Sequence, residues 1–330
     1  MAQRKLNKQQ KQRIRASQDK TRNNQADEQA DENSEKNTGL VIQHHGKQAI
    51  VETSSGELVD CKIRQNLGSI VCGDEVIWQK TLEEQGVILA VKERKNVLAR
   101  PDFRKRPKAF VANIDQIVIV AAVEPELSRH LLDRYLEILE TIKLPGIIVA
   151  NKIDLLSDEN KTSISNQLAT YKDIGYTIIY TSAKTDHELS ELKAALLNKR
   201  SILVGQSGVG KSSIINNLLP DLDVRIGKLS QANHGKHTTS SSVLYHMPTG
   251  GDIVDSPGIR DFSIWHIDPQ DIEAGFIEFS PYKGLCRFNN CKHLNEPGCA
   301  IKQAVVENEI SKERFLSYQH MLEEIELNKK

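Results

Sequence analysis

The stretch that most constrains this chain is residues 205–212, which read G-Q-S-G-V-G-K-S. They match G-x-x-x-x-G-K-S, a pattern in which backbone N–H groups of a glycine-rich turn converge on phosphate oxygens at a helix N-terminus. The apolar run 201–204 precedes the pattern, and residues 213–219 have the composition of a helix start. Because the pattern works only between a strand and a helix, this context favours a nucleotide-phosphate loop over a chance glycine-rich turn.

Two side chains of this loop have predicted roles. Lys211 would reach the β- and γ-phosphates, and the Ser212 hydroxyl would hold Mg²⁺. The loop predicts a bound nucleotide but leaves the base open. The candidate phosphate-contacting residues are Gly205, Gln206, Ser207, Gly208, Val209, Gly210, Lys211, Ser212 and Ser213.

Strands and helices alternate on the N-terminal side of the loop. The near-continuous apolar run 114–123 is typical of a parallel strand buried on both faces, and leucines at helical spacing follow it. The alternation predicts a doubly wound α/β domain over residues 113–265. The expected strands are 114–123, 146–150, 177–180 and 201–204, and the expected helices are 131–142, 159–171 and 189–198.

Two short motifs follow expected strands at the edge where such sheets bind ligands. The first is N-K-I-D, residues 151–154, and the second is S-A-K, residues 182–184. The Asp154 carboxylate can accept both N1–H and N2–H₂ of guanine, whereas adenine offers neither donor on that edge. The motifs therefore predict a guanine nucleotide. The candidate base-contacting residues are Asn151, Lys152, Asp154, Ser182, Ala183 and Lys184.

Each motif residue has an expected contact. Asn151 would contact the purine and tie the base motif to the phosphate loop. Lys152 would lay its aliphatic stem along the base, and the backbone N–H of Ala183 would reach the guanine O6 atom.

The D-S-P-G motif, residues 255–258, lies downstream of the phosphate loop. Asp255 would hold the water shell of Mg²⁺, and the N–H of Gly258 would sense the γ-phosphate. Between the two motifs, G-K-H-T-T at residues 235–239 reads as a switch loop in which Thr239 supplies a hydroxyl to Mg²⁺.

The order of the motifs is unusual, because the base motifs precede the phosphate loop. The sheet expected for a GTPase is retained, but the chain is cut elsewhere, which is a circular permutation. As a consequence, the D-S-P-G motif leads directly into the C-terminal region. One hypothesis is that the nucleotide state moves this region as a lever.

In this order, N-K-I-D, S-A-K, G-Q-S-G-V-G-K-S, G-K-H-T-T and D-S-P-G resemble the ribosome small subunit-dependent GTPase A family of bacteria. The resemblance covers residues 39–300, with Lys236 where the family usually has arginine. It implies a GTPase that binds the small ribosomal subunit and its rRNA, assists late maturation and is stimulated by that subunit. The GTP state would control association and release.

The water-positioning group is not obvious from the sequence. Many GTPases place a glutamine directly after the D-x-x-G motif, but this chain has Ile259, which cannot hydrogen-bond water. His237 is the candidate, supported by the resemblance, with Thr238 and Thr239 beside it. A solvent-facing histidine is the alternative. A GTP-binding RNA scaffold with little hydrolysis and a GTP-gated chaperone of another RNA also fit the motifs.

The N-terminal third divides into three expected segments. Residues 1–38 are polar and at first basic, which predicts a disordered arm that either contacts nucleic acid or solubilises the chain. Five short β-prone runs over residues 39–95 predict a five-stranded barrel of the OB-fold type. Residues 96–112 form a basic connector, either a solvated linker or a strip that contacts phosphates.

The C-terminal region, residues 266–330, carries a Cys₃His set formed by Cys286, Cys291, His293 and Cys299. Four such ligands in a compact span predict one structural Zn²⁺. Residues 312–327 have the pattern of an amphipathic helix. The distant Cys61 and Cys72 are expected in the barrel core.

Composition bounds the remaining expectations. Lys+Arg and Asp+Glu balance at 44 each, so net charge favours no partner. The sequence has neither an apolar stretch long enough to cross a membrane nor a secretory signal, so we expect a cytoplasmic protein without a membrane partner. We also expect it to be a monomer.

Overall fold

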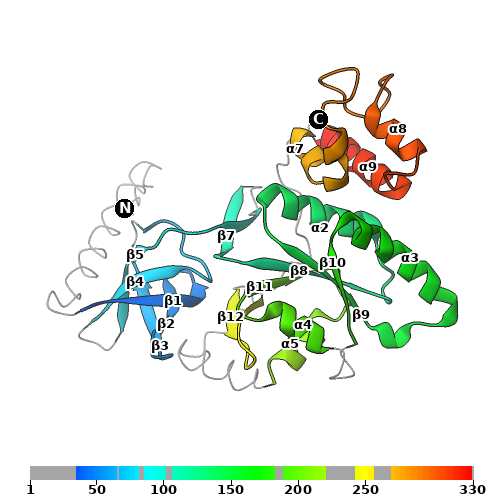
Figure 1. Cartoon of the computed structure of the whole chain (residues 1–330). Coiled ribbons are helices and arrows are strands. Elements are labelled where there is room, and N and C mark those ends of the chain that lie inside the picture. Colours follow the sequence, from blue (N-terminus) through cyan, green and yellow to red (C-terminus); the bar gives the residue numbers. More distant parts are fainter. Residues whose placement is uncertain are drawn as a thin grey trace, which may run out of the picture. The chain divides into compact units, whose positions relative to one another are not determined.

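A computed structural model describes residues 35–64, 67–81, 85–101, 106–182, 189–220, 242–255 and 269–328 (Figure 1). The chain divides into two compact units. The first comprises Met1–Ala99, Ala109–Asn113 and Asp221–Leu244, and the second comprises Arg100–Lys108, Ile114–Pro220 and Tyr245–Lys330.

The first unit contains the predicted five-stranded barrel. Its strands are β1 (Lys36–His45), β2 (Gln48–Thr53), β3 (Leu58–Ile63), β4 (Glu75–Lys80) and β5 (Gly86–Val91). β1 pairs with both β2 and β4, and β5 joins β4 to β3, so the sheet closes on itself. A bulge between Val41 and Gln43 bends β1, which pairs with β4 through its first half and with β2 over most of its length. Cys61 and Cys72 are buried, as predicted.

The basic connector contains a feature that the sequence analysis missed. β6 (Val97–Pro101) and β7 (Pro107–Ala112) form a two-stranded sheet. Pro101 ends one strand and Pro107 begins the other, at positions where a missing N–H is tolerated. The prolines and the many cations concealed the apolar residues that anchor the strands, Leu98, Phe110 and Val111.

The second unit contains the predicted α/β sheet. Its strand order is β10-β9-β8-β11-β13-β12, and all pairs from β10 to β13 are parallel. Every residue of β8 is buried, as its apolar run indicated. The strands are β8 (Gln116–Ala122), β9 (Gly146–Asn151), β10 (Thr177–Tyr180), β11 (Arg200–Val204) and β13 (Asp252–Asp255). The last strand in the order, β12 (Val243–His246), is divided between the units, because Val243 and Leu244 belong to the first.

The helices between these strands confirm the predicted alternation. They are α2 (Arg129–Ile142), α3 (Asp158–Ile174), α4 (Ser190–Leu196) and α5 (Lys211–Leu218), with the short 3₁₀ helix η2 (Ile153–Leu155) after β9. The carboxyl ends of the parallel strands therefore bring the loops after β8, β9, β10, β11 and β13 to one edge of the sheet.

The C-terminal residues belong to the same compact unit as this sheet. They form α7 (Pro269–Ala274), the 3₁₀ helix η4 (Ile277–Tyr282), α8 (Ala300–Val306) and α9 (Lys312–Asn328). The predicted amphipathic helix is α9, which buries Phe315, Tyr318 and Met321 against Phe276 and Phe279. Within the described residues, no helix has both the length and the apolar character needed to cross a membrane.

Candidate nucleotide site and metal centre

The phosphate loop lies between β11 and α5, as the sequence indicated. β11 ends at Val204 and α5 begins at Lys211. Gly205 has a positive φ of 144°, and a Cβ there would collide with the carbonyl oxygen of Val120 in β8. The loop backbone therefore touches the neighbouring strand at a position that only glycine can occupy.

Lys211 reaches back over the loop. Its Nζ donates to the carbonyl oxygens of Gly205 at 2.6 Å and of Gln206 at 2.7 Å. Ser212 and Ser213 are exposed in the first turn of α5, and Val209 is buried. The cation and the helix N-terminus thus lie together, an arrangement that suits anionic phosphate oxygens.

Asn151 ties the base motif to the phosphate loop. Its side chain is fully buried, and its Nδ2 donates to the Val209 carbonyl oxygen at 2.8 Å. Its Oδ1 accepts a hydrogen bond from Thr181 Oγ1 at 3.1 Å. A Cβ on Gly210, whose φ is 95°, would collide with the same Nδ2 atom. The tie expected from the sequence is therefore present, and Thr181 fixes the orientation of the amide.

The sequence analysis did not single out Thr181. It directly precedes Ser182 of the S-A-K motif, and a hydroxyl at that position was the available signal. Its importance depends on a contact with Asn151, a residue distant in sequence.

The two base motifs meet as expected. Ser182 Oγ donates to Asp154 Oδ1 at 2.8 Å, and the Ile153 N–H donates to the Thr181 carbonyl oxygen. Lys152 adopts a left-handed φ of 62°, and its Nζ donates to the Glu124 carbonyl oxygen at 2.7 Å. The Ser182 hydroxyl therefore holds the Asp154 carboxylate, and Lys152 links the same motif to the loop that follows β8.

Asp255 lies at the carboxyl end of β13, next to the strand that leads into the phosphate loop. Its side chain retains solvent access, yet desolvation by its surroundings raises the pKa of its carboxyl, and the positive charge of Lys211 partly opposes that rise. Because desolvation disfavours the negative charge of this carboxylate, a cation bound beside it would be stabilising.

The remaining predicted site residues lie outside the described part of the chain. They are Ala183, Lys184, His237, Thr238, Thr239 and Gly258.

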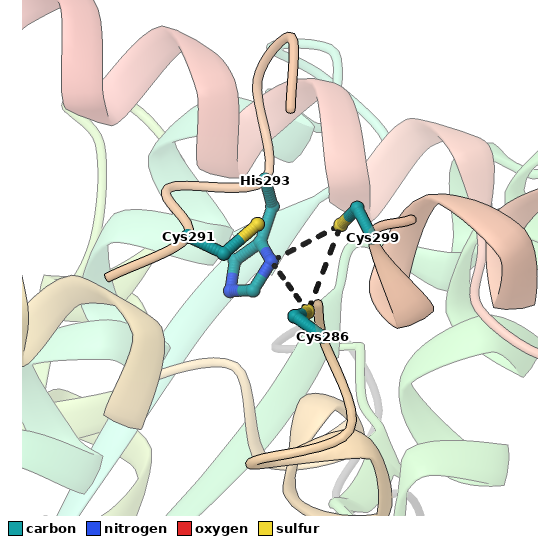
Figure 2. Close-up of side chains that lie close together, drawn as sticks. All are labelled: Cys286, Cys291, His293 and Cys299. Atoms are coloured by element: carbon teal, nitrogen blue, oxygen red, sulfur yellow. Dashed lines mark hydrogen bonds between the residues drawn. The ribbon is translucent and has the colours of Figure 1, made fainter. Parts of the chain in front are cut away.

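The Cys₃His set predicted from the sequence forms one cluster (Figure 2). The four candidate ligand atoms lie within 4.8 Å of one another. His293 Nδ1 is 3.2 Å from Cys299 Sγ and 3.6 Å from Cys286 Sγ, and these two sulfurs are 3.9 Å apart. Tetrahedral Zn²⁺ requires ligand–ligand separations of roughly 3.5–3.8 Å, so the donor set and spacing fit this ion.

Burial and one nearby carboxylate both act on the side chains of the cluster. Burial raises the pKa of the Cys291 thiol to about 12 and that of Cys299 above its ordinary value. The thiolates are therefore disfavoured in the metal-free cluster, and the charge of a bound metal would stabilise them. His293 Nε2 lies 3.4 Å from Glu273 Oε2 in α7, where the carboxylate can orient the imidazole.

Comparisons with known proteins agree with this geometry. Residues 91–265 match the family model described as RsgA GTPase. A relative from Actinobacillus pleuropneumoniae serotype 5b, named small ribosomal subunit biogenesis GTPase RsgA, is 48% identical over 290 residues, covering 86% of this chain and 84% of the relative. A relative of the same name from Proteus mirabilis is 42% identical and covers 98% of this chain and 96% of its own length.

Two solved structures are similar over most of the chain. YjeQ from Thermotoga maritima has a TM-score of 0.72 at 34% identity, covering 88% of this chain and 98% of its own. YloQ, described as a circularly permuted GTPase, has a TM-score of 0.72 at 29% identity, covering 90% and 96%. With its permuted sheet, phosphate loop and matched sequence, the chain belongs to the RsgA GTPase family.

Proposed function

We propose that this protein hydrolyses GTP while it assists the maturation of the small ribosomal subunit, with the GTP state controlling its association and release. The observation that carries the nucleotide part is the buried Asn151 tether between the base motif and the phosphate loop. The names of the relatives, which are small ribosomal subunit biogenesis GTPases, support the ribosomal part.

The guanine base would lie at Asp154, which accepts from the N1–H and N2–H₂ donors while Ser182 Oγ occupies its Oδ1 atom. Because an adenine nucleotide would leave this carboxylate without those donors, the site should reject ATP. Ala183 and Lys184 complete the predicted base contacts.

The phosphates would lie over the loop from Gly205 to Gly210, with Lys211 turning from the loop carbonyls toward the β- and γ-phosphates. Mg²⁺ neutralises phosphate charge in such sites, and Ser212, Thr239 and Asp255 are the residues proposed to hold it and its water. The N–H of Gly258 would contact the γ-phosphate.

His237 is the proposed group that positions the attacking water, with Thr238 and Thr239 beside it, because Ile259 cannot do so. The proposed role of the small subunit is to place this histidine, which gives stimulated rather than intrinsic turnover.

The C-terminal cluster is proposed to hold one structural Zn²⁺, supported by its Cys₃His donors and their spacing. The parts proposed to face rRNA are the barrel, the basic connector and the C-terminal module, which comprises α7, η4, α8 and α9. The proposed compartment is the cytoplasm. The boundaries at residues 95, 112 and 265, between barrel, connector, GTPase and zinc-binding parts, remain proposals. Of the predicted arm at residues 1–38, residues 36–38 lie in strand β1, and residues 1–34 lie outside the described part of the chain.

The deciding experiment is steady-state GTP hydrolysis with and without purified small subunits, for the wild type, His237→Ala and the matched control His234→Ala. We expect strong stimulation in the wild type and in the control and its loss in His237→Ala. Stimulation that survives His237→Ala would move the water-positioning role elsewhere. The absence of any stimulation would refute the ribosomal proposal and favour a GTP-binding RNA scaffold.

A further inference from the structure

A buried ion cluster joins the C-terminal helices to helix α2 of the α/β unit. Arg314 in α9 is 1% exposed, and its Nη1 donates to Asp133 Oδ1 in α2 at 2.7 Å. Its Nε and Nη2 donate to the two carboxylate oxygens of Glu278 in η4, at 2.7 and 3.1 Å. Because a buried guanidinium is tolerated only while it is paired, these contacts fix the three elements together.

A second layer of contacts brings in α3. The Tyr171 hydroxyl donates to Asp133 Oδ1 at 2.7 Å, and the Arg314 guanidinium lies 5.8 Å from the centroid of the Tyr171 ring. The guanidinium also lies 4.3 Å from the centroid of the Phe276 ring. Arg314 therefore lies close to one aromatic ring from α3 and one from the C-terminal module.

The backbones approach closely beside this cluster. A Cβ on Gly275 would lie 2.5 Å from Glu137 Cγ and 2.7 Å from Glu137 Cα. The turn between α7 and η4 therefore rests directly on α2, and only glycine permits that distance.

One end of this assembly is attached to the predicted base motif. α2 follows the loop after β8, whose Glu124 carbonyl oxygen accepts from Lys152 Nζ at 2.7 Å. The Val123 N–H donates to the Asn151 carbonyl oxygen at 3.2 Å. Asp133 lies in the second turn of α2, so the ion cluster is a short distance along one helix from the base motif.

The other end is attached to the metal ligands. Tyr318 lies one turn after Arg314 on α9, and its ring centroid is 6.0 Å from that of His293. Phe279 packs against His293 at 6.3 Å and against Phe276 at 5.3 Å. The ring that covers Arg314 therefore belongs to the same aromatic cluster as the metal-binding histidine.

We propose that Arg314 couples metal binding by the C-terminal module to nucleotide binding. The bound metal then raises the affinity of the guanine nucleotide site. The inference rests on the proposed zinc and nucleotide sites. Metal loss would release His293 from the aromatic cluster, loosen the packing on Arg314 and shift Asp133 with α2. A contiguous buried network can carry such coupling, and its test compares the effect of metal removal with the ion cluster intact and with the cluster removed.

The test measures the affinity of a fluorescent GDP analogue at constant Mg²⁺, before and after treatment with a zinc-selective chelator, with bound zinc quantified by mass spectrometry. The variant is Arg314→Met. Because it leaves the carboxylates of Asp133 and Glu278 without their cation, a second variant combines it with Asp133→Asn and Glu278→Gln, which removes every charge of the cluster. The matched control is Arg129→Met, which breaks an exposed α2–α9 pair with Glu313 at 3.8 Å.

We expect metal removal to weaken GDP binding about fivefold or more in the wild type and in Arg129→Met. In the charge-free triple variant, the same treatment should change the affinity by less than about twofold. Equal GDP affinity of loaded and stripped wild type, or an undiminished metal effect in the triple variant, would overturn the coupling. Failure of the loaded wild type to bind GDP would instead refute the nucleotide site itself.

Discussion

Gly210→Ala offers a direct test of the tether between the two halves of the proposed nucleotide site. Gly210 has a φ of 95°, so an alanine there incurs strain of about 1–2 kcal/mol. Its Cβ would also collide with Asn151 Nδ2, which donates to the Val209 carbonyl oxygen at 2.8 Å. The side chain must move and leave a buried acceptor unpaired, at a cost of about 1–3 kcal/mol.

The same loop provides a matched control. Gly208 also has a positive φ, 85°, but the atom nearest to its added Cβ is Pro125 Cδ at 3.7 Å, an ordinary contact. Gly208→Ala should therefore incur the backbone strain alone. The difference between the two variants isolates the tether, and it should amount to about 1–3 kcal/mol in the free energy of unfolding.

The assay is thermal and urea-induced unfolding of the nucleotide-free protein. Since each kcal/mol shifts the melting temperature of a domain of this size by about 2–4 °C, Gly210→Ala should melt roughly 2–12 °C below Gly208→Ala. In an Asn151→Ala background the collision is absent, so Gly210→Ala should then cost no more than the strain. Equal melting temperatures for the two glycine variants, or fully additive effects with Asn151→Ala, would refute the reasoning.

Three further predictions follow from the site. Asp154→Asn should weaken GTP binding by about 10²-fold or more and favour a xanthine nucleotide, because the xanthine C2 carbonyl accepts a hydrogen bond from the new amide. Competition binding between the two nucleotides measures this preference, and an unchanged preference for guanine would count against Asp154 as the residue that recognises the base. Burial raises the pKa of Asp255 while Lys211 partly opposes it, so the neutral acid is favoured by folding. That stability is present below the unfolded value of 3.8 and is lost as pH rises through the raised folded pKa. The nucleotide-free Asp255→Asn variant should therefore gain stability over the wild type between about pH 4 and 7, and a constant difference in melting temperature across this range would contradict the shift. Cys286→Ser should lose its bound zinc in elemental analysis, whereas Cys61→Ala, in the barrel core, should retain one equivalent; equal zinc content would remove Cys286 from the ligand set.

The Arg314 cluster also restricts the lever hypothesis. A C-terminal module held to α2 by buried charges and by Gly275 does not swing freely against that helix. A nucleotide signal that moves the module must therefore move α2 with it or break the cluster, and the chelation experiment measures that linkage from the other direction.

Much of the fold and the site was accessible from the sequence because the signals are local. The run at β8 predicted a buried parallel strand, and the phosphate loop was placed between β11 and α5 from its flanks alone. Asn151 was expected to tie two motifs together, because the motif itself carries that chemistry, and the hydrogen bond to Val209 confirms the tie. The Cys₃His ligands lie within a short span, so their convergence was also predictable.

Other features were decided only by the tertiary structure. Thr181 matters because Asn151 lies opposite it, and Arg314 is buried because Asp133 and Glu278 arrive from distant segments. An arginine on an amphipathic helix reads in sequence as a solvated residue, and its burial follows from partners that no local pattern indicates. The sequence by itself determined which elements form and which chemistry they carry, since propensity and motif spacing act over a few residues. The long-range packing determined which side chains hold those elements together, because such contacts exist only once the whole chain is folded.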